Sequence, residues 1–172
     1  INLPAIPLRG ITIFPNMIIH FDVGREKSIS ALEESMLKDS KIFLVSQIDP
    51  EIEEPKRNEI YSIGTICKIK QILKLPKGVT RVLVEGVERA AIIDLIEDKK
   101  FMEVLVEKID DELNLKDENE DSALRNLLSK AFKEYIRVPE GDESKVIEVI
   151  TKEEELGKVT DLIAAYIQLD ED

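Results

Sequence analysis

The sequence predicts an α+β fold: a small antiparallel β-barrel with one helix, followed by a small helical subdomain. Three observations lead to this prediction. Between residues 64 and 109, apolar and polar side chains alternate with a period of two, which is typical of half-buried strands. Beyond this stretch the apolar period changes to that of an amphipathic helix. Short segments with Pro or Gly separate the periodic stretches, as turns do.

The first third of the chain predicts two strands around a turn. Residues 3–8 and 17–23 are mainly apolar, and Phe14-Pro15-Asn16 between them favours a turn, because proline presets its own φ angle and asparagine tolerates the next position. Pro4 and Pro7 have no backbone N–H to donate. We therefore expect the first strand to be irregular or to lie at a sheet edge.

A helix, a buried strand and a loop follow. The helix is predicted over residues 25–37, because apolar side chains recur there at helical spacing. They lie on one face: Ile29, Leu32 and Met36. Residues 41–46 are then expected to form a short buried strand. Residues 49–63 are polar and have no apolar period, so they predict a solvated loop.

A long antiparallel hairpin is predicted from Gly64 onward. The apolar side chains of its first strand are expected to point one way: Cys67, Ile69, Leu73 and Leu75. The lysines between them are expected to point the other way: Lys68, Lys70 and Lys74. Pro76-Lys77-Gly78 forms the turn, and residues 81–94 form the returning strand. Gly86 within that strand indicates a bulge or bend.

One more strand and a helical part complete the prediction. A turn at 98–100 leads to a strand over 101–109, and residues 110–121 predict an acidic linker or a frayed helix start. An apolar helical stripe follows, at Leu124, Leu127, Leu128, Ala131, Phe132 and Tyr135.

Residues 138–141 are predicted to end this helix, and Asp142 to begin a short helix through Ile150. Thr151 with Glu154 predicts a capping box for the last helix. Its apolar face is expected at Leu156, Val159, Leu162, Ile163 and Tyr166. We place a β-rich domain at 1–115 and a helical domain at 116–172.

Composition and charge narrow the function classes. The chain has 172 residues and a net charge of −12. Residues 1–109 carry 16 Lys and Arg against 17 Asp and Glu, and residues 110–172 carry 8 against 19. Neither part shows the cation cluster that nucleic-acid binding requires, so we expect no nucleic-acid partner. One cysteine, no leader and no apolar run of about 18 residues favour a cytoplasmic protein without a membrane partner.

The residues with reactive side chains do not form a catalytic pattern. His20 is the single histidine, and no G-x-S-x-G sequence surrounds a serine. Ser129 and Lys130 are neighbours on a predicted helix and therefore face different directions. Gly157-Lys158-Val159-Thr160 resembles only the end of a nucleotide-binding loop. We expect no catalytic, cofactor or metal site in this chain.

A binding surface is the remaining prediction. More large apolar residues than turns usually carry lie at the first turn, the end of the first helix and the hairpin tip: Phe14, Pro15, Met17, Met36, Leu37, Leu75 and Pro76. Polar contacts are expected from the helix start: Arg25, Glu26 and Lys27. The alternatives are that the apolar residues complete a small core and that the charged residues form an ordinary exposed face.

Ordered sequence matches over nearly the whole chain resemble the amino-terminal domain of Lon, the ATP-dependent serine protease. They comprise Leu3-Pro4 through Arg9, Phe14-Pro15-Asn16-Met17, residues 23–29, Asp49-Pro50, Gly64-Thr65, residues 72–78 and residues 82–90. The resemblance implies a PUA-like β-barrel followed by a helical subdomain. It also implies that the chain is a fragment of a longer protein.

The same resemblance implies a non-catalytic module that captures unfolded, damaged or tagged client proteins and helps to assemble a ring oligomer. ATP, Mg²⁺ and the serine–lysine protease chemistry would belong to modules absent from this chain. One alternative is a module for self-association alone, with a weak dimer of the fragment. A further alternative is RNA binding, because PUA-like folds elsewhere bind RNA; this rests on fold analogy alone.

Overall fold

A computed structural model of the chain describes residues 1–96, 100–109, 118–136 and 143–167. The chain divides into two compact units, residues 1–110 and 111–172. The boundary expected near residue 115, the turn at 98–100 and the helix end at 138–141 lie wholly or partly outside the described residues, as does Asp142. Each unit is described here by itself.

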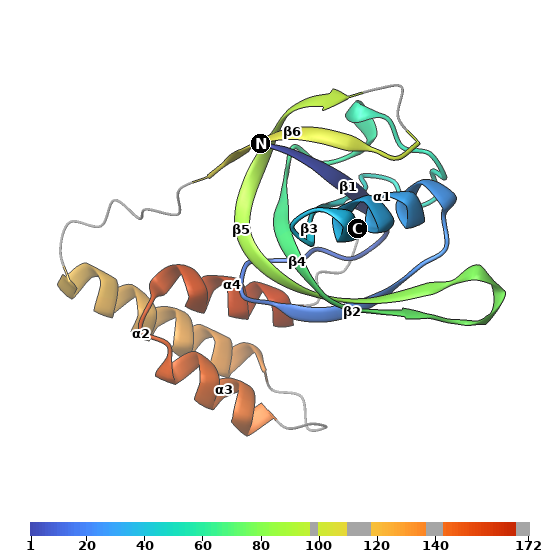
Figure 1. The fold of residues 1–172 in the computed structure, drawn as a ribbon. Helices are drawn as coiled ribbons and strands as arrows, with labels where there is room; N and C mark the ends of the chain where they lie inside the picture. Colours follow the sequence, from blue (N-terminus) through green and yellow to red (C-terminus); the bar gives the residue numbers. More distant parts are fainter. Residues whose placement is uncertain (97–99, 110–117, 137–142, 168–172) are drawn as a thin grey trace. The chain divides into compact units, whose positions relative to one another are not determined.

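The first unit is a closed β-barrel with one helix (Figure 1). Its strands are β1 (Asn2–Leu8), β2 (Ile18–Val23), β3 (Lys41–Ser46), β4 (Ile63–Lys74), β5 (Thr80–Ile96) and β6 (Glu103–Lys108). The strand order is β2-β5-β4-β3-β1-β6, and β6 also pairs with β5, which closes the ring. All pairs are antiparallel except β1 with β3. The predicted barrel is confirmed, with this one parallel pair.

The prolines of β1 predicted that this strand would be irregular or lie at a sheet edge. In the structure β1 lies between β3 and β6. It is paired by two strands in turn: β6 lies opposite residues 2–4, and β3 lies opposite residues 5–8. Pro7 has no backbone N–H, so it leaves no unpaired donor on the side of β1 away from β3. The carbonyl of Pro7 accepts a hydrogen bond from Arg25 on that side. The prolines are tolerated because each half of β1 is paired on one side.

Two register shifts explain where the sequence pattern fails. The pairing of β4 with β5 shifts between Ile69 and Gln71, so that Ile72 packs on the core and Leu73, predicted to point inward, is 51% exposed. A second shift leaves Val87 unpaired beside Gly86, because Ile66 lies opposite Glu88 and Cys67 opposite Gly86. The bulge predicted at Gly86 is therefore confirmed.

The helix α1 (Glu26–Leu37) packs against β1 and β3. Ala31 and Leu32 are fully buried, whereas Met36, predicted on the same apolar face, is 48% exposed. The barrel core comprises two clusters of buried apolar side chains. Their largest fully buried members include Phe43, Ile6, Leu32, Ile42 and Leu44.

The loop after β3 is only partly solvated. It contains a 3₁₀ turn, η1 (Arg57–Glu59), and Pro55 and Ile60 are buried. Ile60 forms a β-bridge with Gln47. The predicted turn of the long hairpin is confirmed as a second 3₁₀ turn, η2 (Pro76–Gly78), and Figure 1 shows the hairpin extending from the barrel.

The described part of the second unit contains three helices: α2 (Glu118–Tyr135), α3 (Glu143–Lys152) and α4 (Leu156–Tyr166). Its small core comprises Phe132, Ile150, Val159 and Ile163. Leu127 and Tyr135, predicted on the apolar stripe of α2, are 63% and 55% exposed. No described helix is both long and apolar enough to cross a membrane.

The predicted capping box at Thr151 is wrong. Thr151 belongs to α3, where its hydroxyl donates to the carbonyl of Ile147. The α4 helix begins after Glu155, which makes no side-chain cap. Because this hydroxyl donates to the carbonyl four residues back, as threonine often does inside a helix, it does not cap the next helix.

Replacing Gly86 by alanine is expected to destabilise the barrel by about 1–3 kcal/mol. A Cβ at this position would lie 2.2 Å from the carbonyl oxygen of Phe14, so either β5 or the turn must move. Urea unfolding followed by circular dichroism measures the change. Gly24→Ala is the matched control, because a Cβ there meets nothing within 4 Å. Equal stability of the two variants would contradict the close approach.

Candidate functional site

The Phe14–Met17 turn is attached to β5, and only part of it is accessible. The N–H of Asn16 donates to the carbonyl of Gly86 over 2.9 Å, and the N–H of Gly86 donates to the carbonyl of Met17 over 2.8 Å. Phe14 and Met17 are half-buried, and Met17 packs on the core. Pro15 is buried, so its predicted role as exposed binding surface is wrong: the turn lies on the bulge at Gly86 and covers it.

The other apolar residues of the predicted surface differ in exposure. Met36 and Leu37, in the last turn of α1, are 48% and 83% exposed. At the hairpin tip Leu75 is half-buried and Pro76 is exposed. Leu37 is the most accessible large apolar side chain among those described. The end of α1 is therefore the most exposed apolar part of the predicted surface.

The charged part of the predicted surface lies on a groove. Arg25, Glu26 and Lys27 line an open cavity of about 1300 Å³ within the first unit. The lining of the cavity includes Ala5 and Pro7 of β1. These two residues lie past Pro4, which is paired with Glu103, the first residue of β6. The walls of the cavity come from the start of α1, the loop at residues 53–58, and residues 95–96 and 100–102. Pockets for small molecules usually enclose about 300–1000 Å³, so this groove is large for such a ligand.

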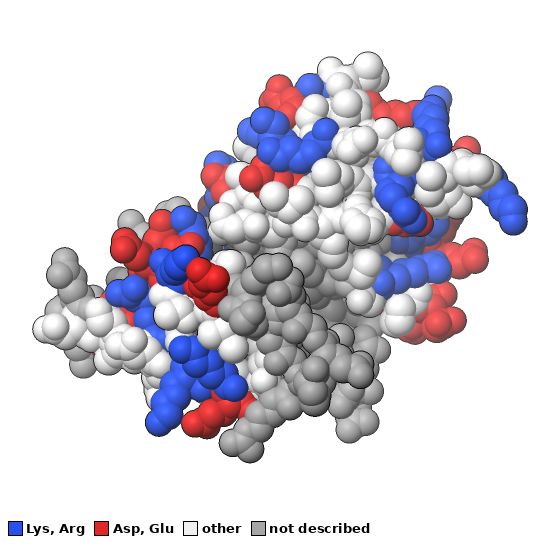
Figure 2. Space-filling model, turned by 90° about the horizontal axis from the view of Figure 1, so that it is seen from below, with Lys and Arg blue, Asp and Glu red and all other residues white. Residues whose placement is uncertain are grey.

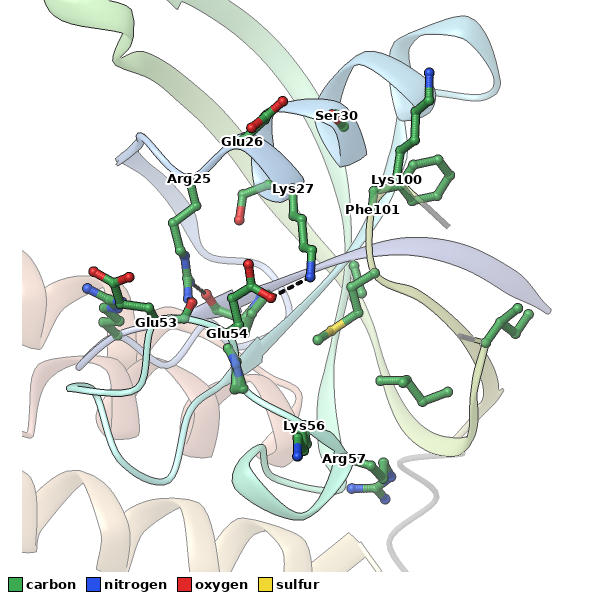
Figure 3. A pocket seen from close by; sticks show the side chains of 18 of the residues that line it. Arg25, Glu26, Lys27, Ser30, Glu53, Glu54, Lys56, Arg57, Lys100 and Phe101 are labelled. Atoms are coloured by element: carbon green, nitrogen blue, oxygen red, sulfur yellow. Dashed lines mark hydrogen bonds and ion pairs between the residues drawn. The ribbon is translucent and has the colours of Figure 1, made fainter. Parts of the chain in front are cut away.

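Arg25 holds three parts of the groove together (Figure 3). Its guanidinium donates to the side-chain oxygen of Gln47 over 2.8 Å, to the carbonyl of Glu53 over 2.9 Å, and to the carbonyl of Pro7. Burial, and then the neighbouring Arg9, lower the pKa of Arg25. All three acceptors are uncharged. Glu53 acts in the opposite direction and raises the pKa of Arg25, but no carboxylate of the described residues lies within ion-pair distance of the half-buried guanidinium.

Gln47 and Arg9 extend this network into the loop. The buried side-chain amide of Gln47 donates to the carbonyls of Asp49 and Ile52, over 3.1 and 2.9 Å. Arg9 donates to the same carbonyl of Ile52 over 3.2 Å. Two polar side chains from distant parts of the sequence therefore fix the backbone of the loop that forms one wall.

The groove gathers cations that are scattered in the sequence. Its lining includes six of them and three carboxylates: Arg9, Arg25, Lys27, Lys56, Arg57 and Lys100, with Glu26, Glu53 and Glu54. Lys27 forms an ion pair with Glu54 over 2.6 Å. Among the described residues, none of the other five cations lies within ion-pair distance of a carboxylate. The groove therefore carries excess positive charge in a chain of net charge −12.

One wall of the groove is apolar. Leu95, Ile96, Phe101 and Met102 line it and are half-buried. Figure 3 shows Arg25 and Lys27 reaching from the start of α1 toward the loop with Glu53 and Glu54, and Phe101 on another side of the cavity. A ligand in the groove would meet charged groups on one side and apolar groups on the other.

The sequence did not predict Arg9, Gln47, Lys56, Arg57 or the wall at residues 95–96 and 100–102 as part of a binding site. Their positions are separated by turns and strands, so no local spacing connects them. Gln47 offers the one usable signal: it is a polar residue directly after a buried strand, and buried polar groups need hydrogen-bond partners.

The reactive side chains of the described chain are not arranged for catalysis. His20 is exposed on β2, and Cys67 is fully buried, where burial raises the pKa of its thiol to about 12. Ser129 and Lys130 lie on α2 as sequence neighbours. Among the described residues, no three His, Cys, Asp or Glu side chains gather as a metal site would require. Binding is the chemistry that this arrangement supports.

The described charges are mixed on the face of the molecule that Figure 2 shows. Lys and Arg side chains lie there beside Asp and Glu, and the described residues form no broad patch of one sign on this face. A nucleic-acid interface needs a continuous cationic surface. The excess positive charge is a property of the groove and not of this face.

A barrel with an open groove and no catalytic constellation among its described residues defines a binding module. The family model described as the ATP-dependent protease La (LON) substrate-binding domain matches residues 2–172. The chain belongs to this family. The fold class and the family expected from the sequence are thereby confirmed.

Relatives and solved structures agree with this assignment. The chain is 43% identical over 165 residues to a Lon protease of Clostridium acetobutylicum and 40% identical over 168 residues to Lon protease 1 of Bacillus subtilis. These matches cover 96% and 98% of the chain but only 21% of each relative. The N-terminal domain of a Mycobacterium avium complex Lon protease shares the fold, with a TM-score of 0.72 over 97% of this chain and 84% of that chain, at 15% identity.

Replacing Arg25 by methionine is expected to loosen the loop at residues 49–56 and to destabilise the first unit by about 1–3 kcal/mol, because a charged donor with three acceptors is lost. Arg25→Lys should not restore stability, since a single ammonium does not span three acceptors as the planar guanidinium does. Hydrogen exchange of peptides covering this loop, with urea unfolding, measures both effects. Lys56→Met is the control on the same loop, and full rescue by lysine would contradict this role of Arg25.

Cys67 is expected to be unreactive in the folded protein. Because burial raises the pKa of its thiol to about 12, the thiolate is scarce at pH 8. Ellman's reagent should label the thiol slowly in buffer and rapidly in urea. Fast labelling of the native protein would show that the barrel opens far more easily than its packing indicates.

Proposed function

We propose that this chain is the non-catalytic client-recognition module of an ATP-dependent protease and that it binds segments of unfolded or damaged proteins. Hydrolysis of ATP with Mg²⁺ and cleavage of peptide bonds would take place in other parts of the longer protein. The curated relatives are about five times longer than the region matched here, which leaves room for such parts. We further propose a cytoplasmic location, where the free thiol of Cys67 would stay reduced.

The open groove is the observation that carries this proposal. It offers cationic and apolar surface side by side within one cavity of about 1300 Å³. Unfolded segments expose both kinds of side chain. Three of the residues predicted for client binding, Arg25, Glu26 and Lys27, line it.

The exposed end of α1 supports a second, weaker contact. Met36 and Leu37 leave apolar side chains in water at the last turn of the helix. Methionine adapts to ligands of different shape, which suits binding of many sequences. Several such modules in one ring would bind a client more tightly than one alone, because later contacts become intramolecular.

The test compares binding of an unfolded protein to the chain and to a surface variant. Fluorescence anisotropy of a labelled globular protein, kept unfolded by reduction and carbamidomethylation, reports the dissociation constant. Met36→Ser with Leu37→Ser should weaken binding by up to about 30-fold, since two exposed apolar contacts of about 1 kcal/mol each are lost. Both side chains are exposed, so the fold should remain intact.

Leu127→Ser is the matched control, because Leu127 is 63% exposed on α2 and does not line the groove. The affinity of this variant for the unfolded protein should stay unchanged. If the chain does not bind the unfolded protein at all, the proposed function is wrong. If Leu127→Ser and the α1 variant lose affinity equally, the end of α1 is not a specific contact.

Self-association is the second candidate function, and one observation favours it. Ile63, Ile93 and Leu105 come from the neighbouring strands β4, β5 and β6 and are 54%, 56% and 36% exposed. Apolar side chains exposed on adjacent strands are a common feature of protein interfaces. Light scattering across concentration should then detect a dimer that Ile93→Asp abolishes. A monomer at every concentration would count against assembly through this face.

A further inference from the structure

This inference rests on the proposed client binding and concerns the class of client segment that the groove binds. We infer that the groove of the first unit binds extended segments in which carboxylates stand next to an apolar residue, and that it recognises them through side chains and not by adding a strand to the sheet. Three features of the groove support this inference: its excess of cations, the hydrogen bonds that the β1 backbone already makes, and its apolar wall.

Charge is the first step. Five groove cations lack a carboxylate within ion-pair distance among the described residues, while Glu26 and Glu53 are the carboxylates left after Lys27 pairs with Glu54. The excess is therefore positive, although the whole chain carries −12. A ligand with carboxylates is attracted into the groove, and a cationic ligand is repelled from it.

Part of this positive charge lies at Arg25 and Arg9, next to the loop that forms one wall of the groove. The two guanidinium groups lie close enough for Arg9 to lower the pKa of Arg25, and both donate to uncharged acceptors of the same loop. Arg25 is half-buried and Arg9 is exposed, and the charge of Glu53 already offsets part of the repulsion between them. A client carboxylate placed between the two guanidinium groups would relieve the rest and could accept bidentate hydrogen bonds.

The backbone of β1 decides the mode of binding. Residues 5–8 of β1 lie past the point where β6 begins at Glu103, and their side that faces the groove resembles an open sheet edge, where an extended peptide could be added as a strand. The N–H of Ala5 is already used by the carbonyl of Met102 over 2.8 Å. Pro7 has no N–H, and its carbonyl accepts from Arg25. This edge therefore offers a client no continuous ladder of hydrogen bonds.

The apolar wall supplies the remaining contact. Leu95, Ile96, Phe101 and Met102 are half-buried, so each leaves part of its apolar surface in water within the groove. An apolar client residue next to a carboxylate would cover this surface while the carboxylate meets the cations. The mixed lining thus requires both kinds of residue close together in the client.

RNA is the competing polyanion, and the lining disfavours it. Three carboxylates, Glu26, Glu53 and Glu54, lie in the cavity and would repel a phosphate backbone. Among the described lining residues Phe101 is the one aromatic side chain, whereas single-stranded RNA usually stacks on several. A peptide with a few separated carboxylates meets less repulsion than a continuous phosphate chain.

The test uses three labelled peptides of about 12 residues that are identical except at three positions, which carry Glu, Gln or Lys beside leucine residues. Anisotropy titrations with the chain should give roughly tenfold tighter binding for the Glu peptide than for the Gln peptide, and the weakest binding for the Lys peptide. The preference should shrink between about 50 mM and about 300 mM NaCl, because exposed charges are screened.

Lys56→Glu is the groove variant, since Lys56 is exposed and should not affect folding. It should weaken binding of the Glu peptide several-fold and leave the Gln peptide unchanged. Lys74→Glu changes the net charge equally at an exposed position of β4 outside the groove, and it should have no effect.

The outcomes separate this inference from the proposed function. Equal affinity for the Glu and Gln peptides, or equal effects of Lys56→Glu and Lys74→Glu, would overturn the inference and leave client binding standing. No binding of any peptide or of the unfolded protein would overturn both. Tighter binding of a uridine oligonucleotide than of the Glu peptide would overturn the inference and assign the groove to RNA.

Discussion

The short length of β6 is the constraint on which both the fold and the groove depend. By pairing with β1 on one side and β5 on the other, β6 closes the barrel. It begins only at Glu103, opposite Pro4, so among the described residues no strand pairs with residues 5–8 of β1 on that side, where the N–H of Ala5 donates to the carbonyl of Met102. The same strand therefore closes the barrel and leaves the cavity open. A longer β6 would complete the sheet and fill the position that the groove occupies.

Arg25 satisfies the backbone that β6 leaves open. The missing N–H of Pro7 removes one unpaired donor, and the guanidinium of Arg25 supplies a partner for the Pro7 carbonyl. The same guanidinium joins Gln47 and the loop at Glu53, so the start of α1, the sheet and the loop are held by one side chain. The edge is protected from unwanted strand pairing, which open edges otherwise invite. The groove is consequently a surface for side-chain recognition.

The surface separates two kinds of contact. The groove combines excess cations with an apolar wall, whereas the end of α1 presents apolar side chains alone. Neither region brings together a nucleophile, a base and an orienting group. Contacts of this kind suit many weak ligands, because each is small and none demands a single ligand shape. Membership of the LON substrate-binding family agrees with such a surface.

Elements with local signals could be predicted from the sequence alone. The turn at Pro76-Lys77-Gly78 and the bulge at Gly86 follow from neighbouring residues, and the structure confirms them. The pairing of β1, the burial of Pro15, the exposure of Leu73 and the assembly of the groove cations became apparent only in the folded chain. These depend on register shifts and on residues far apart in the chain. Sequence periodicity fixes which face a residue occupies within one strand, but not what another segment places against it.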